Sequence, residues 1–168
     1  MDWGAHYGHL ILGYLLAYIL LALSQINPLA DAFQLKKIIR LTLWGITILT
    51  GNKFIIGTVG KAVQFDEMTT YFIDWGHAVW FLYFIMMAET AGAIGILLHF
   101  KLKTGPLAAA GLILIMLGAV YTHWRNQDPF SDSYAAVIQL INLSALLFIY
   151  YSERYIIRKG NQTQIYVI

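Results

Sequence analysis

Two ionisable side chains lie inside apolar stretches of this chain that are long enough to cross a lipid bilayer. Lys53 lies in LTLWGITILTGNKFIIGTVG, and Glu89 lies in FLYFIMMAETAGAIGILLHF. A charge near the centre of a bilayer costs at least ~2.5–3.5 kcal/mol on insertion scales, so such residues usually pair or line a hydrated cavity. An acid and a base in that position can handle protons or hold a carbonyl group. We therefore take Lys53 and Glu89 as the centre of the candidate site.

Counting along the predicted helices places these two residues at similar depth. The stretch that holds Lys53 begins near residue 38, which puts Lys53 roughly 20 Å from that end. The stretch that holds Glu89 ends near residue 99, which puts Glu89 roughly 15 Å from that end. A lysine stem can cover the difference by snorkelling. We predict a direct or water-bridged Lys53–Glu89 pair; the alternative is that Lys53 snorkels outward alone and Glu89 is neutral.

Further polar side chains lie toward the outer half of the same stretches: Asn52, His77, His123, Gln139 and Asn142. Gln139 and Asn142 are three residues apart and therefore share one helical face. Polar side chains in membrane spans usually face the interior of the bundle. We therefore predict a polar cavity that opens toward the outer face and closes near Glu89. Hydrogen bonding between helices, with no ligand, explains Gln139 and Asn142 equally well.

His77 and His123 lie at similar depth on sequential antiparallel helices, an arrangement that is compatible with bis-imidazole haem ligation. However, His77 is twelve residues from Glu89, which turns it about 120° away on an ideal helix. Interfacial hydrogen bonding explains both histidines, so we expect neither haem nor a metal here. No catalytic residue can be assigned, because the chain has no phosphate-binding glycine loop, no Ser-His-Asp arrangement and no His-Glu-x-x-His motif.

The elements that must position these residues are five apolar stretches, at about 5–25, 38–60, 72–99, 106–124 and 134–152. Each must be helical in lipid, because the backbone has no other hydrogen-bond partner there. The stretch at 72–99 is longer than a span needs, so we expect its start to project beyond the membrane or the helix to tilt. Small residues allow helices to approach closely, and we interpret four glycines in this way: Gly57, Gly92, Gly95 and Gly118.

Composition and charge set the class and the orientation. Hydrophobic residues make up 59% of the 168 residues and charged residues only 12%, whereas soluble domains average about 25% charged. Eight basic residues fall in the loops of one side, which places the N-terminus outside and the C-terminus in the cytoplasm. The absence of cysteine excludes thiol–disulfide chemistry by this chain. We therefore predict an all-α, polytopic membrane bundle of five transmembrane helices, with membrane lipids and no nucleic acid as its partners.

Residues 35–151 resemble the DoxX-like family (DoxX/DoxD-related) of small four-helix membrane proteins. The matching features follow one another along the chain: Lys53-Phe54, Gly57 and Lys61; Phe72 and Trp75-Gly76; Glu89, Gly92 and Gly95; Met116, Ala119 and Thr122-His123. The resemblance implies a single membrane domain with an extra N-terminal transmembrane helix (1–27), a four-helix core (35–152) and a cytoplasmic tail (153–168). It also implies an integral protein of the bacterial cytoplasmic (inner) membrane.

The family's members have different roles, so the resemblance leaves three functions open. Some relatives are subunits of quinone-linked redox complexes, which implies an accessory subunit in which Glu89, Lys53 and His123 handle protons or hold a quinone carbonyl. A distant animal relative assists receptor assembly, which implies a scaffold for a partner's transmembrane segment. The third function is a site for a lipid or another lipophilic molecule. A homo-oligomer is compatible with all three, and we expect no stand-alone catalysis.

Overall fold

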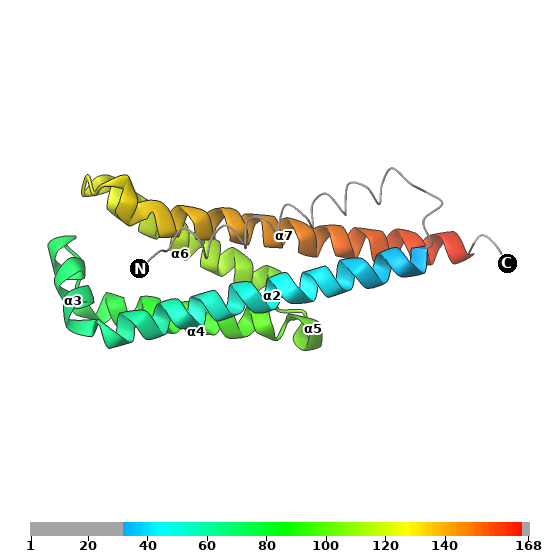
Figure 1. Ribbon diagram of the computed structural model, residues 1–168, viewed down its shortest axis with the longest axis horizontal. Coiled ribbons are helices and arrows are strands. Elements are labelled where there is room, and N and C mark those ends of the chain that lie inside the picture. Colours follow the sequence, from blue (N-terminus) through cyan, green and yellow to red (C-terminus); the bar gives the residue numbers. More distant parts are fainter. Residues whose placement is uncertain (1–31, 166–168) are drawn as a thin grey trace.

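A computed structural model describes the chain from residue 32 to residue 165 (Figure 1). The described part contains no strand and has six helices: α2 (Ala32–Val63), α3 (Phe65–Asp74), α4 (Val79–Leu97), α5 (His99–Leu102), α6 (Gly105–Arg125) and α7 (Phe130–Ile165). The predicted all-α class is therefore confirmed. The predicted first stretch, at 5–25, lies outside the described residues.

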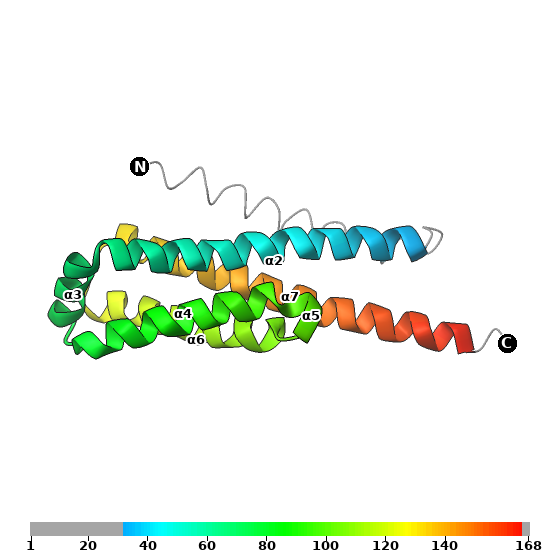
Figure 2. The ribbon, with the colours of Figure 1, turned by 90° about the horizontal axis from the view of Figure 1, so that it is seen from below.

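The four long helices form an elongated antiparallel bundle with a short helix at each end (Figures 1 and 2). Helix α2 packs against α4, α4 against α6, α6 against α7, and α7 back against α2, so the four enclose one core. Helix α3 crosses the end where α2 finishes and α4 begins. Helix α5 lies at the opposite end, before α6. We call these the α3 end and the α5 end.

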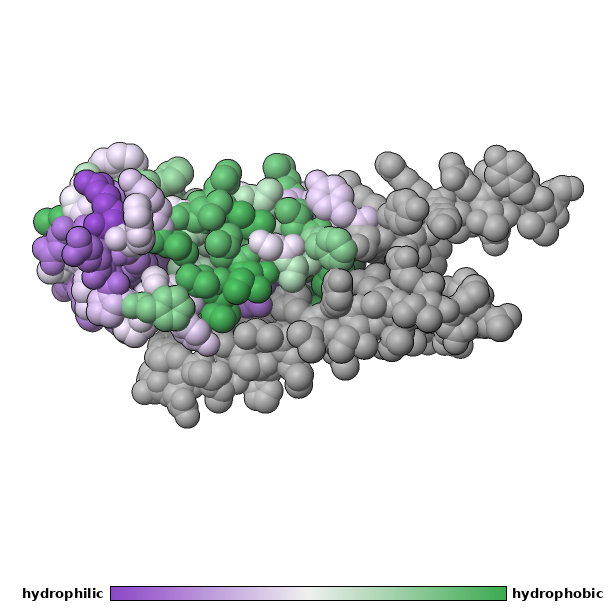
Figure 3. Space-filling view, turned by 90° about the horizontal axis from the view of Figure 1, so that it is seen from above, coloured by the Kyte–Doolittle hydropathy of each residue, from purple (hydrophilic) through white to green (hydrophobic). Residues whose placement is uncertain are grey.

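Three helical segments of the described part are long and apolar enough to cross a membrane: α4, α6 and the segment of α7 from Phe130 to Tyr151. Five were predicted. Among the described residues, the predicted stretch at 38–60 is the one that is not long and apolar enough. This stretch falls in α2, where adjacent Asn52 and Lys53, together with several threonines and glycines, lower the mean hydropathy. Figure 3 shows the resulting division of the surface, with hydrophilic residues at the α3 end and an apolar band beside them.

The predicted long stretch at 72–99 is not one helix. Helix α3 ends at Asp74, and α4 begins only at Val79. Gly76 lies between them with φ +78°, a left-handed conformation that side-chain-bearing residues rarely adopt. The chain therefore turns sharply here, so that α3 lies across the α3 end while α4 runs into the bundle. The 19 residues of α4 span about 28 Å, which matches the hydrocarbon thickness of a bilayer.

Two of the glycines predicted to pack lie at close contacts between α4 and α6. A Cβ added to Gly92 would lie 2.6 Å from Leu112, and one added to Gly95 would lie 2.8 Å from the Cβ of Ala108. Gly57 and Gly118 have open space instead, with no atom within 4 Å of an added Cβ. No described residue therefore packs closely against Gly57 or Gly118, and their packing role stays a prediction.

Close contacts also fix the register of α2 against α4. A Cβ added to Gly51 would lie 2.6 Å from Leu97, the last residue of α4. The segment 32–50 of α2 therefore continues past the end of α4, over roughly 28 Å at ~1.5 Å per residue. Figure 1 shows α2 and α7 extending together beyond α5. At the α5 end, the start of α2 therefore lies far beyond the last residue of α4.

Candidate functional site: a buried ion pair between α2 and α4

Glu89 lies on α4 with its side chain only 4% exposed, and α2 supplies its partners. The Lys61 Nζ lies 2.7 Å from the Glu89 Oε2, and the Thr58 Oγ1 donates to the same oxygen at 3.3 Å. Thr58 and Lys61 are three residues apart, so they project from one face of α2 toward α4. A carboxylate held by an ammonium and a hydroxyl is the central feature of the site.

The base that binds Glu89 is therefore Lys61, whereas the predicted partner was Lys53. Because Gly51 lies opposite Leu97 in two antiparallel helices, residues near 59 of α2 are level with Glu89. Lys53 lies eight residues before Lys61, or about 12 Å lower along the axis of α2. The depth count started from the α5 end and assumed that α2 and α4 are level there. The long projection of α2 beyond α4 makes that assumption wrong.

The ion pair joins the interior of the bundle to its surface. The Glu89 carboxylate is buried, but the Lys61 side chain is 27% exposed. Charge-assisted hydrogen bonds of this length are roughly twice as strong as neutral ones. Removing either partner from a buried pair leaves an uncompensated charge, which is strongly destabilising. The ammonium therefore both neutralises the buried acid and presents donors to whatever lies beside α2 and α4.

Gln139 and Asn142 of α7 are buried, with exposed fractions of 9% and 2%. The Asn142 Nδ2 donates to the Gln139 Oε1 at 3.5 Å. Helices α2 and α7 are antiparallel, and Thr47 lies opposite Tyr150, with their hydroxyl oxygens 3.2 Å apart. In this register Gln139 is level with Thr58 and Asn142 is about one turn further toward the α5 end. The two amides thus lie inside the bundle close to the depth of the ion pair.

Asn52 differs from the prediction, because its side chain is exposed on α2 and does not face the interior. Residues 51 and 54, on either side of the Asn52-Lys53 pair, are the ones buried against the bundle. Adjacent helical positions point about 100° apart, so one polar dipeptide cannot place both side chains in one cavity. The prediction grouped Asn52 with Lys53 by adjacency, which is the wrong criterion on a helix.

The two predicted histidines lie in an aromatic cluster at the α3 end. The His77 ring packs beside Phe72 and Phe81, with ring centroids 6.0 and 5.1 Å away. The His123 ring meets Trp75 edge-on, with ring centroids 5.0 Å apart. Phe72 and Trp75 are themselves in contact, at 5.6 Å, so α3 lies between the two histidines.

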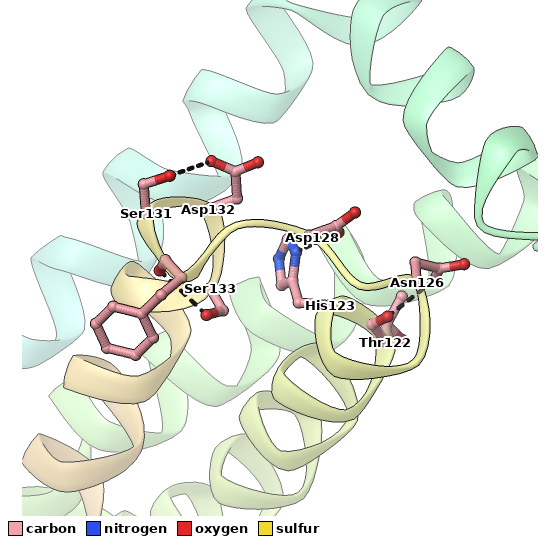
Figure 4. A network of polar contacts seen from close by, with 8 residues as sticks. Thr122, His123, Asn126, Asp128, Ser131, Asp132 and Ser133 are labelled. Atoms are coloured by element: carbon pink, nitrogen blue, oxygen red, sulfur yellow. Dashed lines mark hydrogen bonds and ion pairs between the residues drawn. The ribbon is translucent and has the colours of Figure 1, made fainter.

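His123, near the end of α6, also contacts Asp128 in the loop between α6 and α7 (Figure 4). Its Nδ1 lies 2.8 Å from the Asp128 Oδ2, and the neighbouring Asn126 Nδ2 donates to the Thr122 carbonyl at 2.8 Å. Among the described residues no group of three or more His, Cys, Asp or Glu could hold a metal ion. His123 is thus placed to fix the α6–α7 turn against Trp75.

A second buried polar cluster lies near the α5 end, where sequence reasoning identified nothing. The His99 Nδ1 accepts a hydrogen bond from the Gly105 backbone N–H at 3.1 Å. The His99 ring packs on Tyr150, with ring centroids 4.0 Å apart, and the Tyr150 hydroxyl meets Thr47. A Cβ on Gly105 would lie 2.5 Å from the His99 Nδ1. This cluster joins α2, α5, α6 and α7. The signal in the sequence was a histidine six residues before a glycine at a helix start.

The comparison with known families agrees with this architecture. The family model described as the DoxX-like family matches residues 41–147, which is more than half of the chain. The chain belongs to the DoxX-like family. No curated protein and no solved structure matches it. With the three apolar helical segments, membership of this family makes the chain a membrane protein.

The matched region begins in α2 and ends in α7, so it contains all the residues of the candidate site: Thr58, Lys61, Glu89, Gln139 and Asn142. It ends before Tyr150. The site offers one ammonium that donates hydrogen bonds, one carboxylate that accepts them, and two amides that can both donate and accept. This set can bind a polar group of a lipophilic molecule and can exchange a proton with it.

Proposed function

We propose that this DoxX-like protein is an accessory subunit of a quinone-linked membrane redox complex and that its ion pair holds the polar head of the quinone. One observation carries the proposal: a carboxylate that is 4% exposed binds an ammonium that is 27% exposed. The ammonium can donate to a ring carbonyl from the lipid side while Glu89 keeps it in place. The resemblance to subunits of quinone-linked complexes favours a quinone as the lipophilic molecule.

The role we assign to the site is binding and proton exchange, and the electrons come from a partner subunit. Reduction of a quinone to a quinol adds two electrons and two protons. Glu89 and Lys61 offer an acid–base pair beside the carbonyl oxygen that takes up a proton. The buried amides of Gln139 and Asn142 lie near the same depth and can orient a water molecule beside the pair. We therefore propose no chemical step on this chain beyond proton transfer.

The test is quinone binding to the full-length protein in lipid nanodiscs. Native mass spectrometry with a short-tailed ubiquinone analogue should show one bound quinone per chain. Lys61→Met should weaken binding at least tenfold, since it removes the donor to the carbonyl. Lys101→Met is the matched control, because Lys101 is exposed on α5 at the opposite end of the bundle. Equal binding by Lys61→Met and the unmodified protein would refute the proposal, and a co-purified lipid in place of quinone would favour the general lipophilic site.

A second candidate is an assembly scaffold that binds a partner's transmembrane segment. The observation that favours it is the exposed face of α6. Gly111 and Gly118 are seven residues apart, and both have open space around an added Cβ. Leu107 and Leu114, on the same face, are 80% and 70% exposed. A partner helix that lies on this face should be lost on Gly118→Leu. Retention of every co-purifying membrane protein by that variant would argue against the scaffold.

A further inference from the structure

The side of α2 that points away from the bundle carries a regular row of exposed residues. The row consists of Gly45, Leu49, Asn52, Ile56, Val59 and Val63, which we call the outer seam of α2. Their spacing is 4, 3, 4, 3 and 4 residues, and all six are exposed. Leu49, Ile56 and Val59 are more than half exposed, at 52%, 65% and 55%. Alternating steps of three and four are the pattern by which one helix packs along another in a left-handed coiled coil.

Lipid can cover the apolar members of the seam, but it cannot satisfy Asn52. The Asn52 amide carries two donors and one acceptor. In hydrocarbon such a group stays unsatisfied, which costs several kcal/mol. A single asparagine at the centre of an otherwise apolar seam is also the feature that fixes register and oligomeric state in coiled coils. Asn52 is therefore the observation that calls for a protein partner on this face.

We propose that the outer seam of α2 is a dimerisation surface, on which a second copy of this chain packs in parallel with its own α2. Copies of a membrane protein share one orientation, so a two-fold axis along the membrane normal places each seam residue opposite its counterpart. Asn52 then meets the Asn52 of the second copy, and each amide gives the other both a donor and an acceptor. Gly45 allows the two helices to approach closely at one end.

The dimer leaves the interior of each bundle undisturbed. The residues of α2 that are buried against the other helices include Leu43, Ile46, Thr47, Thr50 and Phe54, none of which belongs to the seam. Lys61 is nine residues from Asn52, which turns it about 180° around an ideal helix. The ion pair with Glu89 therefore lies on the opposite side of α2 from the proposed partner. This inference does not depend on the proposed quinone site.

The stretch at 5–25 is a poorer occupant of the seam than a second copy. Its central segment, LGYLLAYIL, contains no amide and no charged side chain, and the only polar side-chain groups in it are the hydroxyls of Tyr14 and Tyr18. Its histidines, His6 and His9, lie near one end of the stretch. A second copy instead supplies an amide at the matching depth by symmetry.

The chain contains no cysteine, so single cysteines can report on the seam directly. Val59→Cys, in full-length protein in membranes, should form a disulfide-linked dimer under mild oxidation. Leu114→Cys is the matched control, because Leu114 is equally apolar and 70% exposed on α6. Cross-linking at Val59→Cys and not at Leu114→Cys supports the seam. Equal cross-linking at both positions, or none at Val59→Cys, overturns it.

The role of Asn52 needs a second measurement. Single-molecule photobleaching in liposomes of known protein density gives the dimer dissociation constant. Asn52→Leu should weaken the dimer about 3- to 15-fold, which is the range of measured interhelical hydrogen bonds in membranes. Asn52→Gln should keep most of the affinity of the dimer. An unchanged dissociation constant for Asn52→Leu overturns the proposal. A double variant, Val59→Cys with Ala17→Cys, gives a further check. A disulfide within one chain of this variant would place the stretch at 5–25 on the seam and would also overturn the proposal.

Discussion

Replacing Lys61 should destabilise the bundle more than replacing Glu89, although the two residues form one ion pair. Lys61→Met removes the ammonium 2.7 Å from a carboxylate that is 4% exposed. Breaking a fully buried pair in this way costs ~3–5 kcal/mol. Because Lys61 is 27% exposed, water replaces part of its contribution, and we expect a loss of about 2–3 kcal/mol. The remaining Thr58 hydroxyl, at 3.3 Å, is too weak a donor to compensate.

Glu89→Gln is milder, because no buried charge remains. The introduced amide still accepts from Thr58, and the Lys61 side chain can turn toward water. We expect a loss of about 1 kcal/mol, the usual net value of one hydrogen bond. The double variant should lose little more than Glu89→Gln alone, so the coupling energy between the two positions should be about 2 kcal/mol. The measurement is the free energy of unfolding by denaturing detergent in mixed micelles, for the four proteins of the cycle.

Lys53→Met provides the matched cycle with Glu89→Gln. Lys53 lies six residues, or about 9 Å along the axis of α2, from the position level with Glu89, and residues that far apart usually add within ~0.3–0.5 kcal/mol. A small coupling for Lys53 and a large one for Lys61 would support the register described here. Coupling below about 0.5 kcal/mol between Lys61 and Glu89, or a larger value for Lys53, would refute the reasoning.

Three other predictions test the packing. Gly95→Ala should cost about 1–3 kcal/mol by forcing α4 away from α6, whereas Gly118→Ala should be neutral or slightly stabilising, as measured by the same unfolding assay. Tyr150→Phe should cost about 1 kcal/mol, because the Thr47 hydroxyl loses its buried partner without any change in volume; an unchanged unfolding midpoint would contradict this. His123→Phe should remove the contact between His123 and Asp128 and raise amide hydrogen exchange in the α6–α7 loop, while exchange in α4 stays the same.

The sequence predicted the helical class, the positions of α6 and the membrane part of α7, and the presence of an acid–base pair between the second and third stretches. It paired the wrong lysine because depth was counted from ends that are not level. Register between helices is set by the closest contacts, such as Gly51 against Leu97, and no pattern within one helix reveals those contacts. The break at Gly76 was missed because the apolar residues of α3, such as Phe72 and Ile73, were counted together with those of α4, although Asp74 and His77 lie between them.

The failure at Asn52 has a different cause from the failure at Lys53. Burial was predicted from polarity, on the rule that polar side chains in membrane spans face the bundle. That rule concerns all protein neighbours of a helix, and it makes no distinction between helices of the same chain and helices of another. Lys61 and Asn52 satisfy it on opposite sides of α2, the first through α4 and the second, as we propose, through another copy. An exposed amide in an apolar seam is then the expected mark of a helix that lies between two bundles.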